Sequence, residues 1–213
     1  MPHSTNEVHA GDAKYEDLNG DGNITDEDYQ VLGNAFPVLS GSLSFNFEYF
    51  GFDFQVFFQG VWGNKIYNAL RERTEGNGLT NQLSTDMRDV FIYYNEDTRL
   101  TMEDYGLDWQ GYMEQYSGNI PNPCSTNPKN NETSSRFLED GSYLRLKNIT
   151  LGYTLPKAVT QKAKINRLRF YVTANNLLTL TKYSGYDPEV GSGVDYGNYP
   201  QARTVMFGLN LDF

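Results

Sequence analysis

The residues with the clearest chemistry lie near the start of the chain, in the acidic run DLNGDGNITDED at residues 17–28. Oxygen-bearing side chains recur at every second position, and a carboxylate closes the run at its twelfth position. This spacing is typical of a calcium-binding loop, which folds six or more oxygens around one hard cation. The predicted ligands are four side chains and one main-chain carbonyl: the side chains of Asp17, Asn19, Asp21 and Asp28, and the carbonyl of Asn23.

The loop departs from the usual pattern at its last position, where Asp28 replaces the expected glutamate. The shorter side chain favours coordination through one oxygen and a weaker site. Gly22 stands where the loop turns sharply, and the cation expected is Ca²⁺, with Mg²⁺ possible. The alternative is an acidic turn without an ion, held by hydrogen bonds from its own Asp and Asn side chains.

A stretch of regular alternation follows, and it determines the expected fold. In residues 42–60, SLSFNFEYFGFDFQVFFQG, apolar side chains occupy alternate positions on each side of Gly51. A period of two indicates β-strands, and the short glycine-containing join indicates a hairpin. Each run has about ten residues, which is the length a tilted strand needs to cross a bilayer. Strands of soluble proteins average about five or six residues.

Three more strands with the same alternation are predicted at residues 142–156, 168–174 and 203–213, with a bulge near Lys147. The joins are short after the first strand, long after the second, moderate after the third and long after the fourth. Membrane barrels place short turns at the periplasmic end and long loops outside. The acidic loop is therefore expected outside the cell. Five strands cannot close a barrel, so we expect further strands to pair with them.

Composition excludes several other classes of protein. The 213 residues carry a net charge of −10, whereas surfaces that bind nucleic acid are basic. No apolar run approaches the roughly 18 residues of a membrane helix. The first residues lack the features of a secretory signal, which an outer-membrane protein needs, so either the barrel interpretation is wrong or the chain is a piece of something longer. The single cysteine, Cys124, is expected to be a loop thiol, and His3 and His9 have no catalytic partner, so no enzyme is expected.

The segment at about 61–140 is expected to be a long extracellular loop with short helices at 66–72 and 85–94. Such long segments are usually functional or disordered. Trp62, Asn64 and Tyr67 are candidate substrate-binding residues, because their rings and amide could contact a carbohydrate or a peptide. The alternative is that these side chains only pack the loop against itself.

Several runs together resemble the C-terminal part of SusC-like TonB-dependent outer-membrane transporters. They are DLNGDGNITDED, FEYFGFDFQVFFQGVWGNKIYN, FLEDGSYLRLKNITLGYTLP, RLRFYVTANNLLTLTKYSGYDPEV and YPQARTVMFGLNLDF. The resemblance implies an all-β fold, in which this chain supplies the last five strands of a 22-stranded antiparallel transmembrane barrel. Residues 1–40 would form an extracellular loop with the cation site, and residues 41–213 the strands and their loops. Phe213 is similar to the terminal residue that the barrel-assembly machinery reads.

The same resemblance implies the partners of the chain. They are the N-terminal barrel and plug portion of the transporter, a SusD-like surface lipoprotein, the TonB complex acting through the upstream portion, and outer-membrane lipid. The implied function is import of oligosaccharides or peptides across the outer membrane of a Gram-negative cell. The alternative is a soluble calcium-stabilised β-rich binding module, similar in loop chemistry to dockerins. Dockerins carry the loop twice, whereas this chain carries it once.

Overall fold

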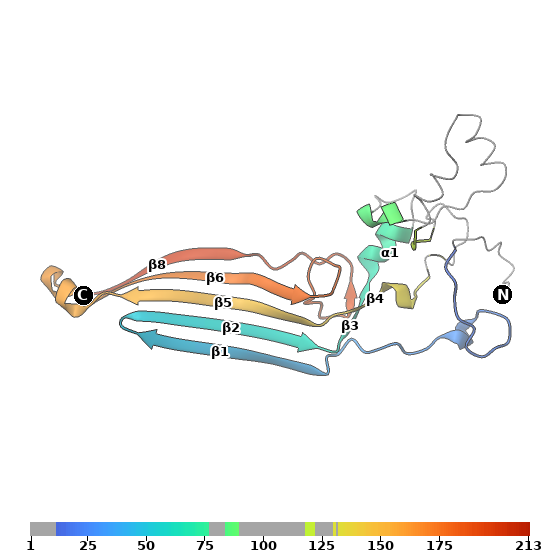
Figure 1. Ribbon diagram of the computed structural model, residues 1–213, viewed down its shortest axis with the longest axis horizontal. Coiled ribbons are helices and arrows are strands. Elements are labelled where there is room, and N and C mark those ends of the chain that lie inside the picture. Colours follow the sequence, from blue (N-terminus) through green and yellow to red (C-terminus); the bar gives the residue numbers. More distant parts are fainter. Residues whose placement is uncertain (1–11, 77–83, 90–117, 122–129, 131) are drawn as a thin grey trace, which may run out of the picture. The chain divides into compact units, whose positions relative to one another are not determined.

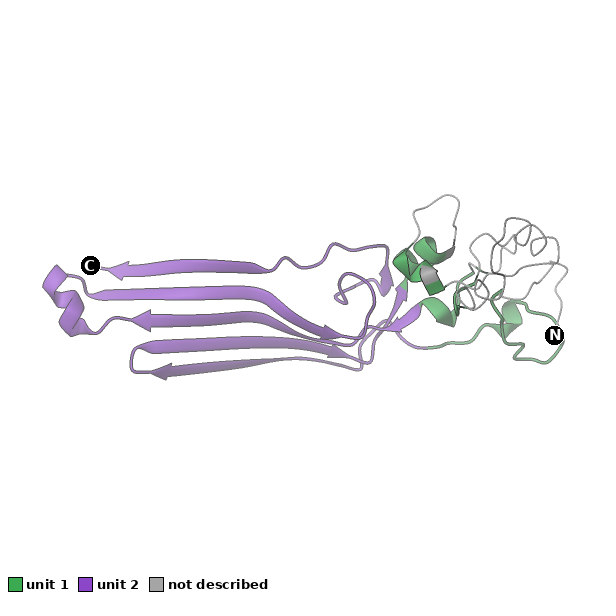
Figure 2. Cartoon of the chain, turned by 45° about the horizontal axis from the view of Figure 1, so that its top comes forward, with its two compact units in different colours: residues 1–32, 68–137 green, residues 33–67, 138–213 purple. Residues whose placement is uncertain are grey.

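The computed structural model describes residues 12–76, 84–89, 118–121, 130 and 132–213, which are coloured in Figure 1. Cys124, His3, His9 and residues 90–94 of the second predicted helix lie outside the described residues. The chain divides into two compact units, which Figure 2 colours separately. Unit 1 holds residues 1–32 and 68–137, and unit 2 holds residues 33–67 and 138–213.

Unit 2 is built on a five-stranded antiparallel sheet with the strand order β1-β2-β5-β6-β8 (Figure 1). The strands are β1 (Leu39–Tyr49), β2 (Phe52–Trp62), β5 (Tyr143–Thr154), β6 (Arg167–Thr181) and β8 (Thr204–Asp212). The five strands predicted from alternation are confirmed, as is their antiparallel pairing. With nine to fifteen residues each, they are longer than most strands of soluble domains.

The register of the sheet places like side chains side by side on each face. One row runs across all five strands as Phe47, Phe54, Leu151, Val172 and Phe207. We call the side of the sheet that carries this row the apolar face. Successive residues of a strand point to opposite sides, so the residues that precede and follow each of these along its strand lie on the other side, the polar face. Large hydrophobic side chains of the apolar face are exposed in this chain, with Phe207 84% exposed.

The turn between β1 and β2 requires a glycine at position 51. Phe50 and Gly51 both have positive φ angles, 47° and 84°, as a two-residue hairpin turn requires. A Cβ atom on Gly51 would lie 2.7 Å from the carbonyl oxygen of Thr154. Thr154 in turn donates its N–H to the Gly51 carbonyl at 2.7 Å, so the hairpin end is fastened to β5.

The predicted bulge near Lys147 is confirmed. The pairing of β5 with β6 shifts between Leu146 and Asn148, which leaves Lys147 opposite an irregular stretch of β6 that contains Asn176 at a φ of 52°. The pairing of β2 with β5 also shifts, between Phe57 and Phe58 of β2, opposite the same stretch of β5. A bulge lets a strand bend without reversing its faces further along.

Unit 2 also contains a small sheet that the alternation did not predict, with the order β4-β3-β7. Its strands are β3 (Lys65–Asn68), β4 (Leu138–Asp140) and β7 (Val194–Asp195). The prediction that a helix begins at Ile66 is therefore wrong, because residues 65–67 pair with residues 138–140. The helix α1 (Ala69–Gly76) begins after Asn68, whose side-chain oxygen accepts the N–H of Arg71 at 2.9 Å.

The two ends of the large sheet differ. One end carries the β1–β2 turn, the end of β8, and the β5–β6 join with α4 (Lys157–Thr160) and the 3₁₀ helix η5 (Gln161–Ala163). We call it the short-turn end. The other, the loop end, carries the small sheet and the segment between β6 and β8 (Figure 1). This division agrees with the predicted alternation of short and long joins.

The described part of unit 1 contains α1 and three 3₁₀ helices: η1 (Asp26–Asp28), η2 (Thr85–Asp89) and η4 (Ser135–Phe137). The carboxylate of Glu75 is buried and forms ion pairs with Arg71, at 2.5 Å, and with Arg136. Of the predicted helix at 85–94, the described part is η2. No helix in the described part of the chain is long and apolar enough to cross a membrane.

Candidate functional site

The acidic loop is closed by hydrogen bonds from its own backbone. Asp17 accepts the N–H groups of Gly20, at 2.7 Å, and Gly22, at 2.9 Å, one on each carboxylate oxygen. Both glycines have positive φ angles, 76° and 85°, which few other residues adopt at low cost. Further along, the Asn19 side chain accepts the N–H of Asp21 at 2.9 Å.

The last residue of the loop closes it on the first ones. Asp28 accepts the N–H of Leu18 on one oxygen and the N–H of Thr25 on the other, both at 2.8 Å. These two bonds, with that from Thr25 the stronger influence, hold the pKa of Asp28 below its usual range. The lowered pKa keeps the Asp28 side chain in its ionised form, which is the form that binds a cation.

The hydrogen bonds match the alternative of an acidic turn, but they leave room for a cation. Within the described residues, no three Asp, Glu, His or Cys side chains are gathered as a metal site. A carboxylate oxygen that accepts one N–H keeps a second lone pair for an ion. Asp21 accepts the N–H of Asn23 on one oxygen, at 2.7 Å, and the side-chain amide of Asn19 on the other, at 3.3 Å. The cation at Asp17, Asn19, Asp21, Asn23 and Asp28 stays a prediction.

A chain of amides and hydroxyls runs across the middle of the polar face. The Asn148 amide donates to Thr173, at 3.0 Å, and to Asn175, at 2.8 Å. Thr150 donates its hydroxyl to Thr173 at 2.7 Å, and Asn175 continues the chain to Thr204 of β8 at 3.1 Å. These side chains form hydrogen bonds with one another and make an uncharged polar surface across three strands.

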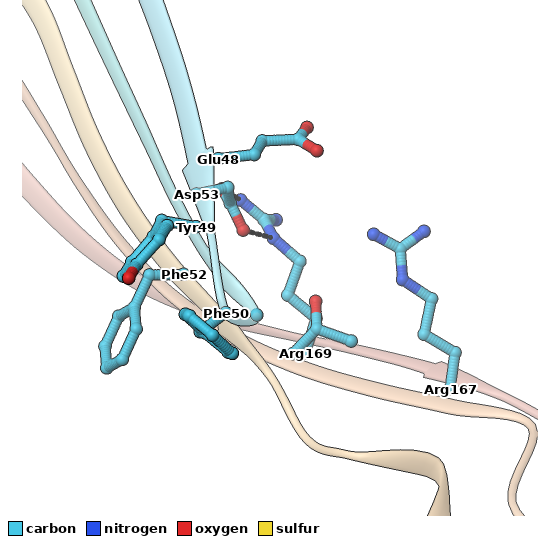
Figure 3. A pocket seen from close by; sticks show the side chains of 9 residues that line it. Glu48, Tyr49, Phe50, Phe52, Asp53, Arg167 and Arg169 are labelled. Carbon is cyan, nitrogen blue, oxygen red and sulfur yellow. Dashed lines mark hydrogen bonds and ion pairs between the residues drawn. The ribbon is translucent and has the colours of Figure 1, made fainter.

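A groove of about 550 Å³ lies at the short-turn end (Figure 3). An ion pair between Asp53 of β2 and Arg169 of β6 spans it, with Asp53 Oδ1 accepting from Arg169 Nε at 2.8 Å. The pair passes over Gly152 of the intervening strand β5. A Cβ atom on Gly152 would lie 2.4 Å from Asp53 Oδ1 and 2.5 Å from Arg169 Nη2, so only glycine leaves space for the pair.

A buried arginine organises the loop end of the polar face. The side chain of Arg145 in β5 is 2% exposed and contacts Asp187 at 2.6 Å and Glu189 at 2.8 Å. Its Nε also donates to the Thr179 hydroxyl of β6 at 2.9 Å. Lys147 adds an ion pair to Glu189 at 2.8 Å. These contacts join the segment after β6 to the strand β5.

Asp187 is held ionised by the same contacts. Burial acts to raise its pKa, but the N–H groups of Gln201 and Glu189, both at 2.9 Å, and the guanidinium of Arg145 outweigh burial. The pKa of Asp187 is therefore lower than its ordinary value. This cluster was not predicted from the sequence, because Arg145 between Leu144 and Leu146 fits the ordinary alternation of a strand.

The predicted substrate-binding residues have different surroundings. Trp62 ends β2 and is partly exposed. Asn64 is buried, and its main-chain carbonyl accepts the N–H of Gly141 at 2.9 Å. Tyr67 belongs to β3, and its N–H donates to the carbonyl of Gly193 at 2.8 Å. Their binding of substrate stays a prediction. Phe213 follows the last strand at the short-turn end, is exposed, and stays a predicted assembly signal.

Comparison with known proteins finds relatives along nearly the whole chain. It is 32% identical to TonB-dependent receptor P3 of Formosa agariphila over 95% of this chain and 19% of the relative. It is 31% identical to TonB-dependent receptor SusC of Bacteroides thetaiotaomicron over 93% of this chain and 17% of the relative. The chain thus spans about a fifth of the length of these relatives. No family model matches it.

Solved structures agree with the sequence relatives. The RagAB peptide transporter matches with a TM-score of 0.67 and 25% identity, over 90% of this chain and 19% of that chain. The RagAB peptide importer in its closed-closed state matches with a TM-score of 0.66 and 26% identity, over 94% of this chain and 20% of that chain. The long antiparallel strands therefore correspond to part of a much larger β-structure.

Proposed function

This chain belongs to the SusC-like TonB-dependent receptors, and we propose that it forms neighbouring strands at the C-terminal end of their transmembrane barrel. TonB-dependent receptors are outer-membrane β-barrel proteins, and the relatives are receptors and transporters, not enzymes. The proposed role of the chain is to complete the wall through which a nutrient is imported.

The exposed apolar face is the observation that carries this proposal. Leu43, Phe45 and Phe47 of β1 and Val205 and Leu209 of β8 are all at least half exposed. A folded soluble domain would bury such a row, because large contiguous apolar patches are rare on monomers. On a membrane barrel, the same row faces lipid while the polar face lines the interior.

The edges of the sheet support incorporation into a larger barrel. β1 and β8 each pair with only one strand of the described sheet, so each presents a row of backbone N–H and C=O groups on its outer edge. In lipid, each unpaired group costs several kcal/mol, and closed barrels avoid that cost. The remaining strands of the receptor are the proposed partners, with the plug portion and the TonB complex acting from the upstream part.

The relatives support a proposal for the cargo and for a surface partner. RagAB is named as a peptide importer, and SusC is named as a TonB-dependent receptor. We therefore propose import of oligosaccharides or peptides together with a SusD-like surface lipoprotein. The uncharged polar surface around Asn148 and Thr173 supports such cargo, since it would line the interior with groups that neither bind charges tightly nor repel polar molecules.

The proposal predicts that the 213-residue chain does not fold alone in water. Expressed by itself, it should aggregate or require detergent, whereas the intact receptor should be found in the outer membrane with heat-modifiable mobility in electrophoresis. Fractionation and gel mobility check both results. A monodisperse, detergent-free monomer of the chain with cooperative unfolding would instead favour the soluble calcium-stabilised module.

We also propose that the acidic loop binds Ca²⁺ outside the cell. Ca²⁺ accepts six to eight oxygens at about 2.3–2.6 Å, while Mg²⁺ keeps several waters. Asp17, Asp21 and Asp28 supply three negative charges to a short segment, and a cation would relieve their repulsion. Loops of this kind in extracellular modules bind at about 10⁻⁴–10⁻³ M, which suits the shorter side chain at position 28.

Equilibrium dialysis of the intact receptor against ⁴⁵Ca²⁺ is expected to reveal this site. The double variant Asp17→Asn/Asp21→Asn should bind one Ca²⁺ fewer per receptor, because neutral amides coordinate the ion more weakly. Asp26→Asn is the matched control, since Asp26 lies in the same loop at a position that supplies no predicted ligand. Equal binding by wild type and the double variant would leave the hydrogen-bonded turn as the whole role of the loop.

A further inference from the structure

We propose that residues 183–201, the segment between β6 and β8, line the cargo pathway and that their exposed tyrosines bind an uncharged oligosaccharide. This inference rests on the proposed transport function and names the class of cargo for it. We call these residues the tyrosine loop.

The tyrosine loop lies over the polar face of the sheet. Its residues Asp187 and Glu189 bind Arg145 at 2.6 and 2.8 Å. Arg145 stands opposite Gln59 and Thr179 in the register, whereas its neighbour Leu144 pairs with Leu180 on the apolar face. If the apolar face meets lipid, the loop covers the interior side of the barrel wall.

Two buried aspartates make the loop rigid. Asp187 accepts the N–H groups of Glu189 and Gln201, so it fastens the end of the loop to its beginning. Asp195 is fully buried and accepts the hydroxyl of Tyr183 at 2.7 Å. Its other oxygen accepts the N–H groups of residues 197 and 198 at 2.8 Å each. The backbone on both sides of the exposed tyrosines is thus fixed.

Three other tyrosines of the loop are exposed. Tyr186, Tyr196 and Tyr199 are 66%, 63% and 90% exposed, in contrast to the buried Tyr183. Tyr186 precedes Asp187, and Tyr199 lies two residues before Gln201, whose N–H binds that same carboxylate. The Asp187 contact therefore brings these two tyrosines into one region. Rigid exposed tyrosines offer large contact area at a small cost in side-chain entropy.

The charges of the loop select the class of ligand. Its only charged residues are Asp187, Glu189 and Asp195, and each is engaged in the contacts above. The loop therefore presents rings, glycines and the amide of Asn198, while its three carboxylates are already engaged by an arginine, by a tyrosine hydroxyl or by backbone N–H groups. Ring faces with a hydroxyl at the edge match the apolar faces and hydroxyls of neutral sugars.

Binding by the purified intact receptor tests the proposal. The receptor is applied to an array of neutral and acidic oligosaccharides and, separately, to a mixture of random peptides. We expect neutral oligosaccharides to be retained. Titration calorimetry with the best-retained one should then show at least tenfold weaker binding for Tyr186→Ala/Tyr199→Ala, because both stacking surfaces are removed.

Two further variants separate stacking from general damage. Tyr186→Phe/Tyr199→Phe keeps the rings and should retain most of the affinity, and Tyr29→Ala, which removes an exposed tyrosine in unit 1, should bind like wild type. The proposal is overturned if the receptor retains only peptides or acidic sugars, if it retains nothing, or if the alanine variant binds as well as wild type. A receptor that assembles in the outer membrane but gives any of these results leaves the transport function intact.

Discussion

Phe207→Arg is expected to prevent most of the receptor from assembling in the outer membrane. Phe207 lies at the middle of β8 on the apolar face and is 84% exposed in this chain. A charged residue at the bilayer midplane of such a face costs about 2–4 kcal/mol. That is a large part of the roughly 5–15 kcal/mol that stabilises a typical folded protein. Heat-modifiable mobility and surface protease protection measure the assembled fraction.

The control residues for this prediction lie on the same strand and the opposite face. Met206 is the adjacent residue and pairs with Thr173, while Asn210 pairs with Arg169. Met206→Arg and Asn210→Arg place the same charge toward the barrel interior and should assemble far better than Phe207→Arg. A small penalty is expected for Asn210→Arg, because like charges on directly opposite residues are destabilising. Equal loss in all three variants would contradict the assignment of the two faces.

The large sheet could be predicted because its information is local. Alternation with a period of two assigns Phe45 and Phe54 to one face from their neighbours alone. Gly51 marks the hairpin turn, and the break in alternation before Lys147 marks the bulge. The register then follows from matching apolar rows, since a slip of one residue would move every side chain to the other face.

The small sheet and the tyrosine loop could not be predicted, because their contacts join residues that are far apart in sequence. β3 pairs with β4 across more than sixty residues, and these pairs outweigh the helical tendency of residues 66–68. Nothing local marks Arg145 as the partner of Asp187, 42 positions away. The occupancy of the acidic loop cannot be read from the sequence for another reason, because the same Asp17 oxygens can bind a backbone N–H or a cation.

Arg145→Met is expected to release the tyrosine loop from the sheet. The substitution keeps much of the side-chain volume but leaves Asp187 buried without its guanidinium partner. Removing one partner of a buried ion pair costs about 3–5 kcal/mol. Hydrogen exchange at the Glu189 and Gln201 amides, which donate to Asp187, should therefore accelerate about a hundredfold or more at neutral pH. Oligosaccharide binding by the tyrosine loop should weaken in the same variant.

Lys147→Met is the matched control, because Lys147 and its partner Glu189 are both partly exposed and such pairs contribute about 0–1 kcal/mol.

Lowering the pH provides an independent check of the Asp187 contact. The pKa of Asp187 is lower in the folded chain than in the unfolded one, so its contribution is complete above the unfolded value near pH 4. That contribution is lost as the pH falls through the lower folded value. The protection of these amides in wild type, relative to exchange from the unfolded chain at the same pH, should thus fall only below about pH 4. Unchanged exchange at Glu189 and Gln201 in Arg145→Met would show that backbone contacts alone hold the loop.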